Sequence, residues 1–311
     1  MKIGFMGTPD FAKAVLEGLI KDGHDVRVVL TQPDKEVGRG KKIQYSPVKN
    51  LALENNIPVW QPEKVKAETD MTDRLKALNL DILIVVAYGQ ILPNDVIASA
   101  KYGTVNVHAS LLPHLRGAAP IQRAIVNGDK LTGVTIMDVA EKLDAGDMLS
   151  KAEVEIGDMN FEQLHDKLAE VGTKLLLETL PKIEDGTVIR EKQDDSLATY
   201  AKMVFKQDGK IDFTRDPYEI ECQIRGFDPW PGAFATLDGT DTVVKFWKAE
   251  PLDITSTEPG KVIAVDNKSF TVSCGGKALR VTEIQVPGKK RTAFSEYVKG
   301  HSDISVGSMF I

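Results

Sequence analysis

Before Gly186, the pattern of apolar and polar positions divides the chain into two kinds of segment, which alternate. Short apolar runs typical of β-strands alternate with longer segments whose apolar residues recur at helical spacing, which indicates βαβ units and a parallel sheet. The run at 81–87 is apolar after its first residue, as expected for a central strand covered on both faces. Strands are expected at 2–6, 25–31, 81–87, 103–108, 132–138 and 148–156, and helices at 11–22, 47–56, 72–79, 118–127 and 160–180. Ser46 and Asn160 are the expected N-caps of two of these helices.

The pattern changes after Gly186. The stretch 191–208 is polar, with few periodic apolar positions, and is expected to be a linker. Beyond it, short alternating runs are separated by glycine, proline and Asx turns, which is typical of a small β-barrel or sandwich. One helix is expected at 218–225. The predicted organisation is an amino-terminal α/β domain at 1–189, a linker at 190–208 and a carboxy-terminal β domain at 209–311.

Composition sets limits on the class of protein. With 311 residues, 42% of them hydrophobic and 27% charged, the chain is expected to be globular and to form two domains. No apolar run approaches the roughly 18 residues that span a bilayer, so a cytoplasmic protein with no membrane contact is expected. Cys222 and Cys274 belong to no cysteine or histidine cluster, so we expect both to be buried and the protein to hold no metal.

The net charge of −6 gives no general reason to expect a nucleic-acid partner, so such a partner would have to use a local basic patch. One candidate is 34–49, where five basic residues oppose two acidic ones and glycines flank Arg39. This composition favours a loop that closes on phosphates or a nucleic-acid backbone. A solvated loop is the ordinary interpretation of such a charge run. A smaller patch, Lys289-Lys290-Arg291, is open to both interpretations.

The strongest chemical signal lies in the strand expected at 103–108. Alternate side chains of a strand share a face, so Asn106 and His108 point the same way. An amide donor beside an imidazole at a strand's carboxyl end can polarise a carbonyl and move a proton, and a carboxylate would complete an acyl-transfer site. Asp144 is the expected carboxylate, with Asp147 as a competitor in the same loop.

Each of these residues also has a structural interpretation. Asn106 could bond a neighbouring loop, His108 could be a satisfied buried histidine, and Asp144 could be a turn residue before Gly146. The chain would then be a nucleotide-binding module without catalysis. No GxGxxG, P-loop or Gly-x-Ser-x-Gly motif is present, and His108 and His114 lack the spacing and third ligand of a metal site.

The same residues carry a resemblance to a known family. The segments 106–113 and 116–122 resemble the signature of formyltransferases that use 10-formyltetrahydrofolate, and 143–147 resembles the aspartate loop of that family. Three further segments are similar to those of the members that formylate methionyl-initiator tRNA: 3–12, 32–42 and 224–233. The resemblance covers essentially the whole chain.

The resemblance implies a Rossmann-like formyltransferase domain with a parallel-sheet core, followed by a smaller OB-like β-barrel that binds tRNA. It implies transfer of the formyl group of 10-formyltetrahydrofolate to the α-amino group of methionyl-initiator tRNA for translation initiation. The alternative is a folate-dependent formyltransferase acting on a small amine, such as a nucleotide sugar or glycinamide ribonucleotide. The long basic loop and the β domain favour tRNA, since a small acceptor needs neither. Nothing in the sequence indicates a subunit interface, so a monomer is expected.

The resemblance also assigns roles to individual residues. The catalytic positions fall on Asn106, His108 and Asp144. The folate-contacting segment falls on Ser110, Leu111, Leu112 and Pro113. Partly by the same analogy, the folate ring is expected against the wall formed by Ala87, Tyr88, Gly89, Gln90, Ile91 and Leu92, with the 138–144 loop opposite. The expected tRNA contacts are Arg39, Lys41 and Lys42.

Overall fold

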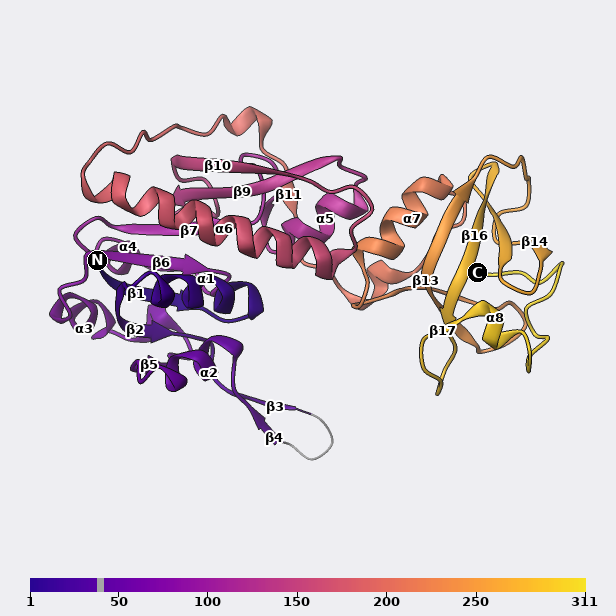
Figure 1. The fold of residues 1–311 in the computed structure, drawn as a ribbon, viewed down its shortest axis with the longest axis horizontal. Helices are drawn as coiled ribbons and strands as arrows, with labels where there is room; N and C mark the ends of the chain where they lie inside the picture. Colours follow the sequence, from indigo (N-terminus) through magenta and orange to yellow (C-terminus); the bar gives the residue numbers. More distant parts are fainter. Residues whose placement is uncertain (38–41) are drawn as a thin grey trace. The chain divides into compact units, whose positions relative to one another are not determined.

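The computed structural model describes residues 1–37 and 42–311, which form two compact units (Figure 1). The first unit contains Met1–Gly117, Leu131–Glu155 and His165–Ala201. The second contains Ala118–Lys130, Ile156–Leu164 and Lys202–Ile311. The stretch 190–208, expected to be a linker, is thus divided between the units at Ala201.

A seven-stranded sheet forms the centre of the first unit, with the strand order β10-β9-β7-β6-β1-β2-β5. Neighbours from β7 to β5 are parallel, whereas β9 runs antiparallel to both β7 and β10. The expected parallel-sheet core is confirmed, with two further strands joined to one edge by antiparallel pairing. The bounds are β1 Lys2–Gly7, β2 Asp25–Leu30, β5 Val59–Trp60, β6 Ile82–Val86, β7 Thr104–His108, β9 Leu131–Asp138 and β10 Met148–Glu155.

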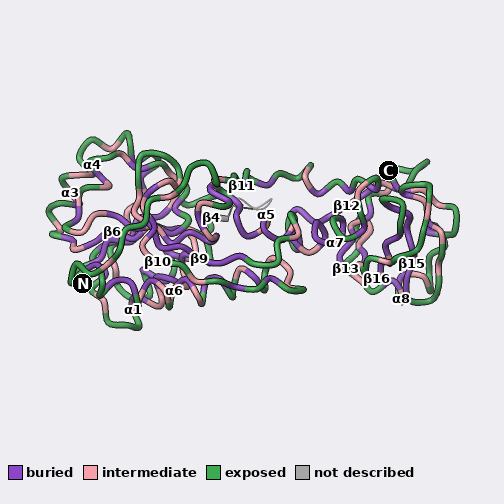
Figure 2. The backbone as a smooth tube through the Cα atoms, turned by 90° about the horizontal axis from the view of Figure 1, so that it is seen from above, coloured by how far each residue is buried: buried purple, intermediate pink, exposed green. Residues whose placement is uncertain are grey.

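Helices connect and cover these strands. Their bounds are α1 Asp10–Lys21, α2 Pro47–Glu54, α3 Met71–Ala77, α4 Asn94–Ile97 and α6 Phe161–Glu184. Ser46 caps α2 as expected, because its hydroxyl oxygen accepts the Lys49 N–H at 3.0 Å. Helices α1 and α6 lie side by side (Figure 1), and a Cβ added at Gly18 of α1 would overlap the Thr173 side chain of α6. In Figure 2 the buried residues follow the central strands, so the core of this unit lies on the two faces of its sheet.

The second unit is built on an antiparallel sheet with the strand order β12-β13-β16-β15-β14, and β17 pairs with β16. Phe310 donates its N–H to the Gly260 carbonyl before β14, and Ile311 exchanges two backbone hydrogen bonds with Thr236 of β12. Because the chain end thereby joins both edges, the sheet closes into a barrel, as expected. The bounds are β12 Ala233–Thr236, β13 Val243–Leu252, β14 Val262–Val265, β15 Phe270–Cys274, β16 Lys277–Gln285, β17 Thr292–Ala293, α5 Pro120–Val126, α7 Pro217–Gly226 and α8 Phe294–Tyr297.

Aromatic packing fills this barrel. The Phe270 ring contacts the rings of Phe246, Phe294 and Phe310, with centroids 5.1–5.9 Å apart. Cys222 and Cys274 are fully buried and free, as expected from the sequence. Throughout 1–37 and 42–311, none of the helices combines the length and the apolar character that crossing a membrane requires.

Candidate active site

Asn106 and His108 lie on the same face of β7, as expected from strand alternation. Val107, between them, faces α6: a Cβ added at Gly172 of α6 would lie 3.2 Å from the Val107 side chain. The two polar side chains therefore point away from α6, to the opposite face of the sheet. Val85 of β6 pairs with Asn106, so the loop that follows β6 begins at the same sheet edge.

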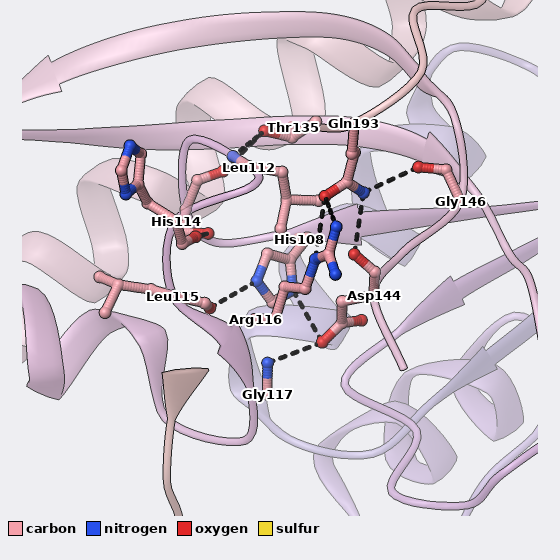
Figure 3. A network of polar contacts seen from close by, with 11 residues as sticks. His108, Leu112, His114, Leu115, Arg116, Gly117, Thr135, Asp144, Gly146 and Gln193 are labelled. Carbon is pink, nitrogen blue, oxygen red and sulfur yellow. Dashed lines mark hydrogen bonds and ion pairs between the residues drawn. The ribbon is translucent and has the colours of Figure 1, made fainter. Parts of the chain in front are cut away.

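His108 is fixed through one ring nitrogen and faces a carboxylate with the other (Figure 3). The residue is 6% exposed, and its Nε2 lies 3.0 Å from the carbonyl oxygen of Leu115. Because a carbonyl only accepts hydrogen bonds, Nε2 carries a hydrogen. Nδ1 lies 3.8 Å from Oδ2 of Asp144, which is longer than a hydrogen bond. A second proton, on Nδ1, would make the ring a cation beside this carboxylate.

Asp144 reaches His108 from a turn in the loop between β9 and β10. Its backbone φ is +49°, a left-handed conformation that aspartate adopts more readily than most residues. Its Oδ2 accepts the Gly117 N–H at 2.8 Å, and its side chain is 13% exposed. Its other carboxylate oxygen accepts no hydrogen bond from the part of the chain that the structure describes. Asp144 is therefore a turn residue and also the carboxylate that faces the imidazole.

The competing carboxylate, Asp147, belongs to the base of the same loop. Its backbone carbonyl accepts the Asp138 N–H at 2.8 Å, and the Asp138 side chain accepts a hydrogen bond from Arg190 Nε at 2.8 Å. Burial raises the pKa of the Asp138 carboxyl, the hydrogen bond from Arg190 opposes this rise, and the Asp147 carboxylate adds to it. Of the two candidates, Asp144 is the one held beside the ring of His108.

Gly146 sets the path of this loop, because a Cβ at that position would overlap the carbonyl oxygen of Asp138. The substitution Gly146→Ala is expected to lower the free energy of unfolding by about 1–3 kcal/mol, since the backbone must shift to admit the methyl group. Urea denaturation measures this change. Gly300→Ala is the matched control: beyond Gly300 and its two chain neighbours, no atom of the described residues lies within 4 Å of the added Cβ, and we expect a change within about 0.5 kcal/mol. Equal stability of the two variants would show that the loop admits a side chain without strain.

In the segment 110–113, an expected folate contact, two of the four residues are buried within the protein. Ser110 and Leu112 are buried, and the Ser110 hydroxyl donates to the His114 carbonyl at 2.6 Å. Thr135 holds the backbone, since its hydroxyl donates to the Ser110 carbonyl at 2.7 Å and accepts the Leu112 N–H at 3.1 Å. Leu111 and Pro113 are half-buried, so their side chains are the ones partly open to a ligand.

The folate-binding wall expected at 87–92 also contains both buried and exposed residues. Tyr88 and Leu92 are 1% and 7% exposed and belong to the core of the first unit. The Gln90 side chain is held by hydrogen bonds: its amide oxygen accepts the Val65 N–H at 2.8 Å, and its amide nitrogen donates to the Pro62 carbonyl at 3.0 Å. The open positions of this wall are Ala87, Gly89 and Ile91, the last of which is 82% exposed.

Two of the expected tRNA contacts, Arg39 and Lys41, lie outside the described residues. The backbone of Lys42 begins β4 (Lys42–Gln44), which pairs with β3 (Lys35–Val37). Lys49 anchors the base of this hairpin: its ammonium donates to Asp34 at 2.6 Å and to Gln61 at 2.8 Å. The root of the basic loop is therefore fixed to the first unit.

Other polar groups around the site were not expected from the sequence. Arg116, Gln193 and Thr199 surround the loop that carries Leu115, and Thr199 accepts the N–H groups of Leu115 and Arg116 through its hydroxyl and carbonyl. The strands β8 (Arg116–Gly117) and β11 (Tyr200–Ala201) pair in parallel. Gln193 and Thr199 lie in the polar stretch 191–208, and polarity alone names no partner; Arg116 begins the signature segment 116–122, but the resemblance assigned it no role of its own. Among residues 1–37 and 42–311, no group of three or more histidines, cysteines or acidic residues gathers as a metal site would require.

Comparison with known proteins places the chain in a family. Residues 1–180 match the family described as formyl transferase, and residues 203–302 match its C-terminal domain. The methionyl-tRNA formyltransferase of Caldanaerobacter subterraneus subsp. tengcongensis is 46% identical over 303 residues, 97% of each chain. That of Bacillus subtilis is 47% identical over 302 residues, 96% of this chain and 94% of the relative.

Two solved structures show the same fold at lower identity. The sugar 3N-formyl transferase WlaRD aligns with a TM-score of 0.66 and 19% identity, over 93% of this chain and 99% of that one. Phosphoribosylglycinamide formyltransferase from Bacillus halodurans aligns with a TM-score of 0.51 and 22% identity, over 60% of this chain and 97% of that one. The family matches and the curated relatives together establish that the chain belongs to the formyl transferase family.

Proposed function

We propose that the chain transfers the formyl group of 10-formyltetrahydrofolate to the α-amino group of methionyl-initiator tRNA, giving N-formylmethionyl-tRNA for translation initiation. The observation that carries this proposal is the full-length similarity to methionyl-tRNA formyltransferases. The pairing of His108 with Asp144, on the face of β7 that also carries Asn106, supplies the groups that such a transfer needs.

The role of Asn106 and His108 is to stabilise negative charge on the formyl oxygen. The Asn106 side chain is half-buried and makes no hydrogen bond within 1–37 and 42–311, so its amide is free to donate. His108 is anchored at Nε2 by the Leu115 carbonyl, so Nδ1 is the nitrogen available for a further proton. Donors fixed in advance at a water-poor site stabilise a developing oxyanion more than water does.

Asp144 stabilises the protonated ring and handles the proton that the reaction releases. A free α-amine titrates near about 8 and an esterified one lower, so the attacking amine needs little activation. The new carbon–nitrogen bond forms to this amine, the bond to the folate nitrogen breaks, and one proton passes from the first nitrogen to the second. The Asp144 oxygen not bonded to Gly117 carries that proton, directly or through a held water.

The folate is proposed to bind beside this site. The folate supplies an activated formyl group. Exposed apolar residues lie on the two loops that border the site: Ile91, in the loop after β6, is 82% exposed, and Leu143, next to Asp144, is 62% exposed. We propose that they cover the faces of the flat folate ring. Leu111 and Pro113 would extend the contact along the 110–113 segment.

The basic loop is proposed to bind the acceptor end of the tRNA through Arg39, Lys41 and Lys42. Arg39→Ala is expected to raise KM for the charged tRNA and to leave folate affinity intact, because the variant lacks one cation that would bind a phosphate. The slope of log KM against log salt should fall by about one unit for each phosphate that is no longer neutralised. Steady-state kinetics across a salt series measures both effects, and an unchanged slope with unchanged kinetics would assign the loop to solvent.

Formylation of charged initiator tRNA by the purified protein, with 10-formyltetrahydrofolate as donor, tests the proposed function. A nucleotide amino sugar and glycinamide ribonucleotide serve as competing acceptors in the same assay. We expect transfer to the tRNA alone. Transfer to a small amine would establish the alternative, and no transfer to any acceptor would leave a module without catalysis.

The monomeric state and the cytoplasmic location expected from the sequence belong to the same proposal. Neither depends on the arrangement of the site. Sedimentation velocity tests the first, with a single species near 34.1 kDa as the expected result.

A further inference from the structure

We propose that Gln193 is a positioning residue that fixes the Asp144 carboxylate relative to the His108 ring. The inference rests on the proposed function and deepens it, because it assigns the control of the site's geometry to a residue of the polar stretch 191–208. The Gln193 side chain makes its hydrogen bonds to Arg116 and to two backbone carbonyls, and none to the imidazole or the carboxylate. It acts through the backbone of the turn that carries Asp144.

The Gln193 amide bonds both ends of that turn (Figure 3). Its Nε2 donates to the carbonyl oxygen of Asp144 at 2.8 Å and to that of Gly146 at 2.8 Å. Both hydrogens of one NH2 group are thereby used on the two carbonyls that enclose Ala145. A turn with a left-handed residue, such as Asp144, needs such contacts to hold its conformation.

The other end of the Gln193 amide is held as firmly. Its Oε1 accepts from Arg116 Nε at 3.0 Å and from Arg116 Nη2 at 2.8 Å, and Nη2 also donates to Asp195 at 2.8 Å. Arg116 is 3% exposed, so its guanidinium is fixed in place. A reversed amide would set its NH2 against the guanidinium and its oxygen against two carbonyls, so the partners define one orientation.

These contacts close a ring around Asp144. Its carboxylate accepts the Gly117 N–H, its carbonyl accepts from Gln193, and Gln193 is bonded to Arg116, the residue before Gly117. Hydrogen bonds thus connect both parts of Asp144 to the same two-residue strand, β8. The side chain bonds Gly117 directly, and the backbone is connected to Arg116 through Gln193. With both ends fixed, the carboxylate has one position relative to Nδ1 of His108, at 3.8 Å.

A tie between chain segments could serve stability alone, so the test must separate the two roles. Gln193→Glu keeps the acceptor for Arg116 but replaces both donors with a carboxylate that faces two carbonyl oxygens. If Gln193 only anchors Arg116, this variant behaves as wild type. If Gln193 positions Asp144, kcat falls although the hydrogen bond from Arg116 remains. Gln193→Leu removes both sets of hydrogen bonds and gives the upper limit of the effect.

We expect both variants to lower kcat by about 10–100-fold, since a misplacement of about 1 Å costs up to about 10² in rate. KM for the charged tRNA and for 10-formyltetrahydrofolate should stay within about two-fold of wild type, because substrate binding groups are untouched. Steady-state kinetics on the full chain, with circular dichroism to verify folding, gives these values.

Two control variants separate positioning of Asp144 from a role in stability and from a role in anchoring Arg116. Gln223 bonds two backbone carbonyls with its Nε2 in the same way, at 2.9 and 3.0 Å, but in the second unit, so Gln223→Leu is expected to lower Tm and leave kcat unchanged. Asp195→Asn weakens the ion pair of Arg116 without touching Gln193 and is expected to leave kcat unchanged.

A wild-type kcat in Gln193→Glu would overturn the proposal, whether Tm is unchanged or lowered, and a lowered Tm would then show that the Gln193 hydrogen bonds serve stability alone. A crystal structure of Gln193→Glu gives a readout that needs no activity: we expect the Asp144 carboxylate to move away from Nδ1 of His108. An unmoved carboxylate would also overturn the proposal. Failure of the wild-type protein to formylate tRNA would instead contradict the proposed function, so the two failures are distinguishable.

Discussion

Replacing His108 with alanine is expected to lower kcat for formyl transfer by about 10²–10³-fold, the loss typical of one removed oxyanion donor. The reason is geometric: the ring is 6% exposed, its Nε2 is occupied by the Leu115 carbonyl, and Nδ1 faces Asp144. Alanine removes both the donor and the group that Asp144 stabilises. Single-turnover formylation with both substrates saturating measures the chemical step without product release.

His114→Ala is the matched control for this variant. His114 lies in the same loop and is exposed, and in Figure 3 its ring points away from Asp144. Its carbonyl, rather than its ring, accepts the Ser110 hydroxyl, so alanine preserves that bond. We expect a rate close to wild type for His114→Ala. Equal single-turnover rates for the two variants would remove His108 from the chemistry.

Asp144→Ala is expected to cost as much as the loss of His108, or more, because it removes both the counter-charge of the ring and the proposed proton carrier. Asp144→Asn separates charge from structure. Asparagine can still accept the Gly117 N–H and tolerates the left-handed backbone at φ +49°, so the turn should persist. We expect a loss of about 10²–10³-fold in kcat for this variant too, of the size seen when a single electrostatic group is removed from a site.

Asp147→Asn controls for the general loss of a charge from the loop and is expected to retain activity. The double variant His108→Ala/Asp144→Ala should lose less than the product of the two single losses, since residues that act as a unit are not additive. Full multiplication of the two effects would show that the imidazole and the carboxylate act independently. A normal rate in Asp144→Asn would show that the carboxylate charge is not needed.

Local rules were sufficient for the parts of the fold that depend on neighbours in sequence. The cap of α2 at Ser46 followed from residue type and position, and the shared face of Asn106 and His108 followed from the period of a strand. Strand β5 was missed because Val59–Trp60 is too short to show a periodic pattern, and its place is set by pairing with β2.

Contacts between distant residues were beyond such rules. The sequence offered Asp144 and Asp147 as alternatives, and only the loop geometry, with Asp138 bonded to the Asp147 backbone, directs Asp144 to the ring. Arg116 and Gln193 are 77 positions apart, and no pattern predicts that they meet. The stretch 191–208 has few periodic apolar positions, and the hydrogen bonds of Gln193 attach its first part to the site.

The wall expected at 87–92 illustrates the same limit. Resemblance treated its six residues alike, whereas the fold turns Tyr88 and Leu92 into the core and leaves Ile91 at the surface. For this reason Ile91→Glu is a better probe of folate binding than a change at Leu92, which would also destabilise the core cluster. Burial, which decides this difference, is a property of the whole unit.

In the proposed reaction an amide, an imidazole and a carboxylate converge on one migrating carbon. A crystal structure of the protein with an unreactive analogue of 10-formyltetrahydrofolate tests it most directly. We expect the oxygen of the formyl group to lie about 3 Å from Asn106 Nδ2 and from Nδ1 of His108, the range of a hydrogen bond, with Asp144 alongside. An analogue bound elsewhere, or with its formyl group turned away from all three side chains, would contradict the account.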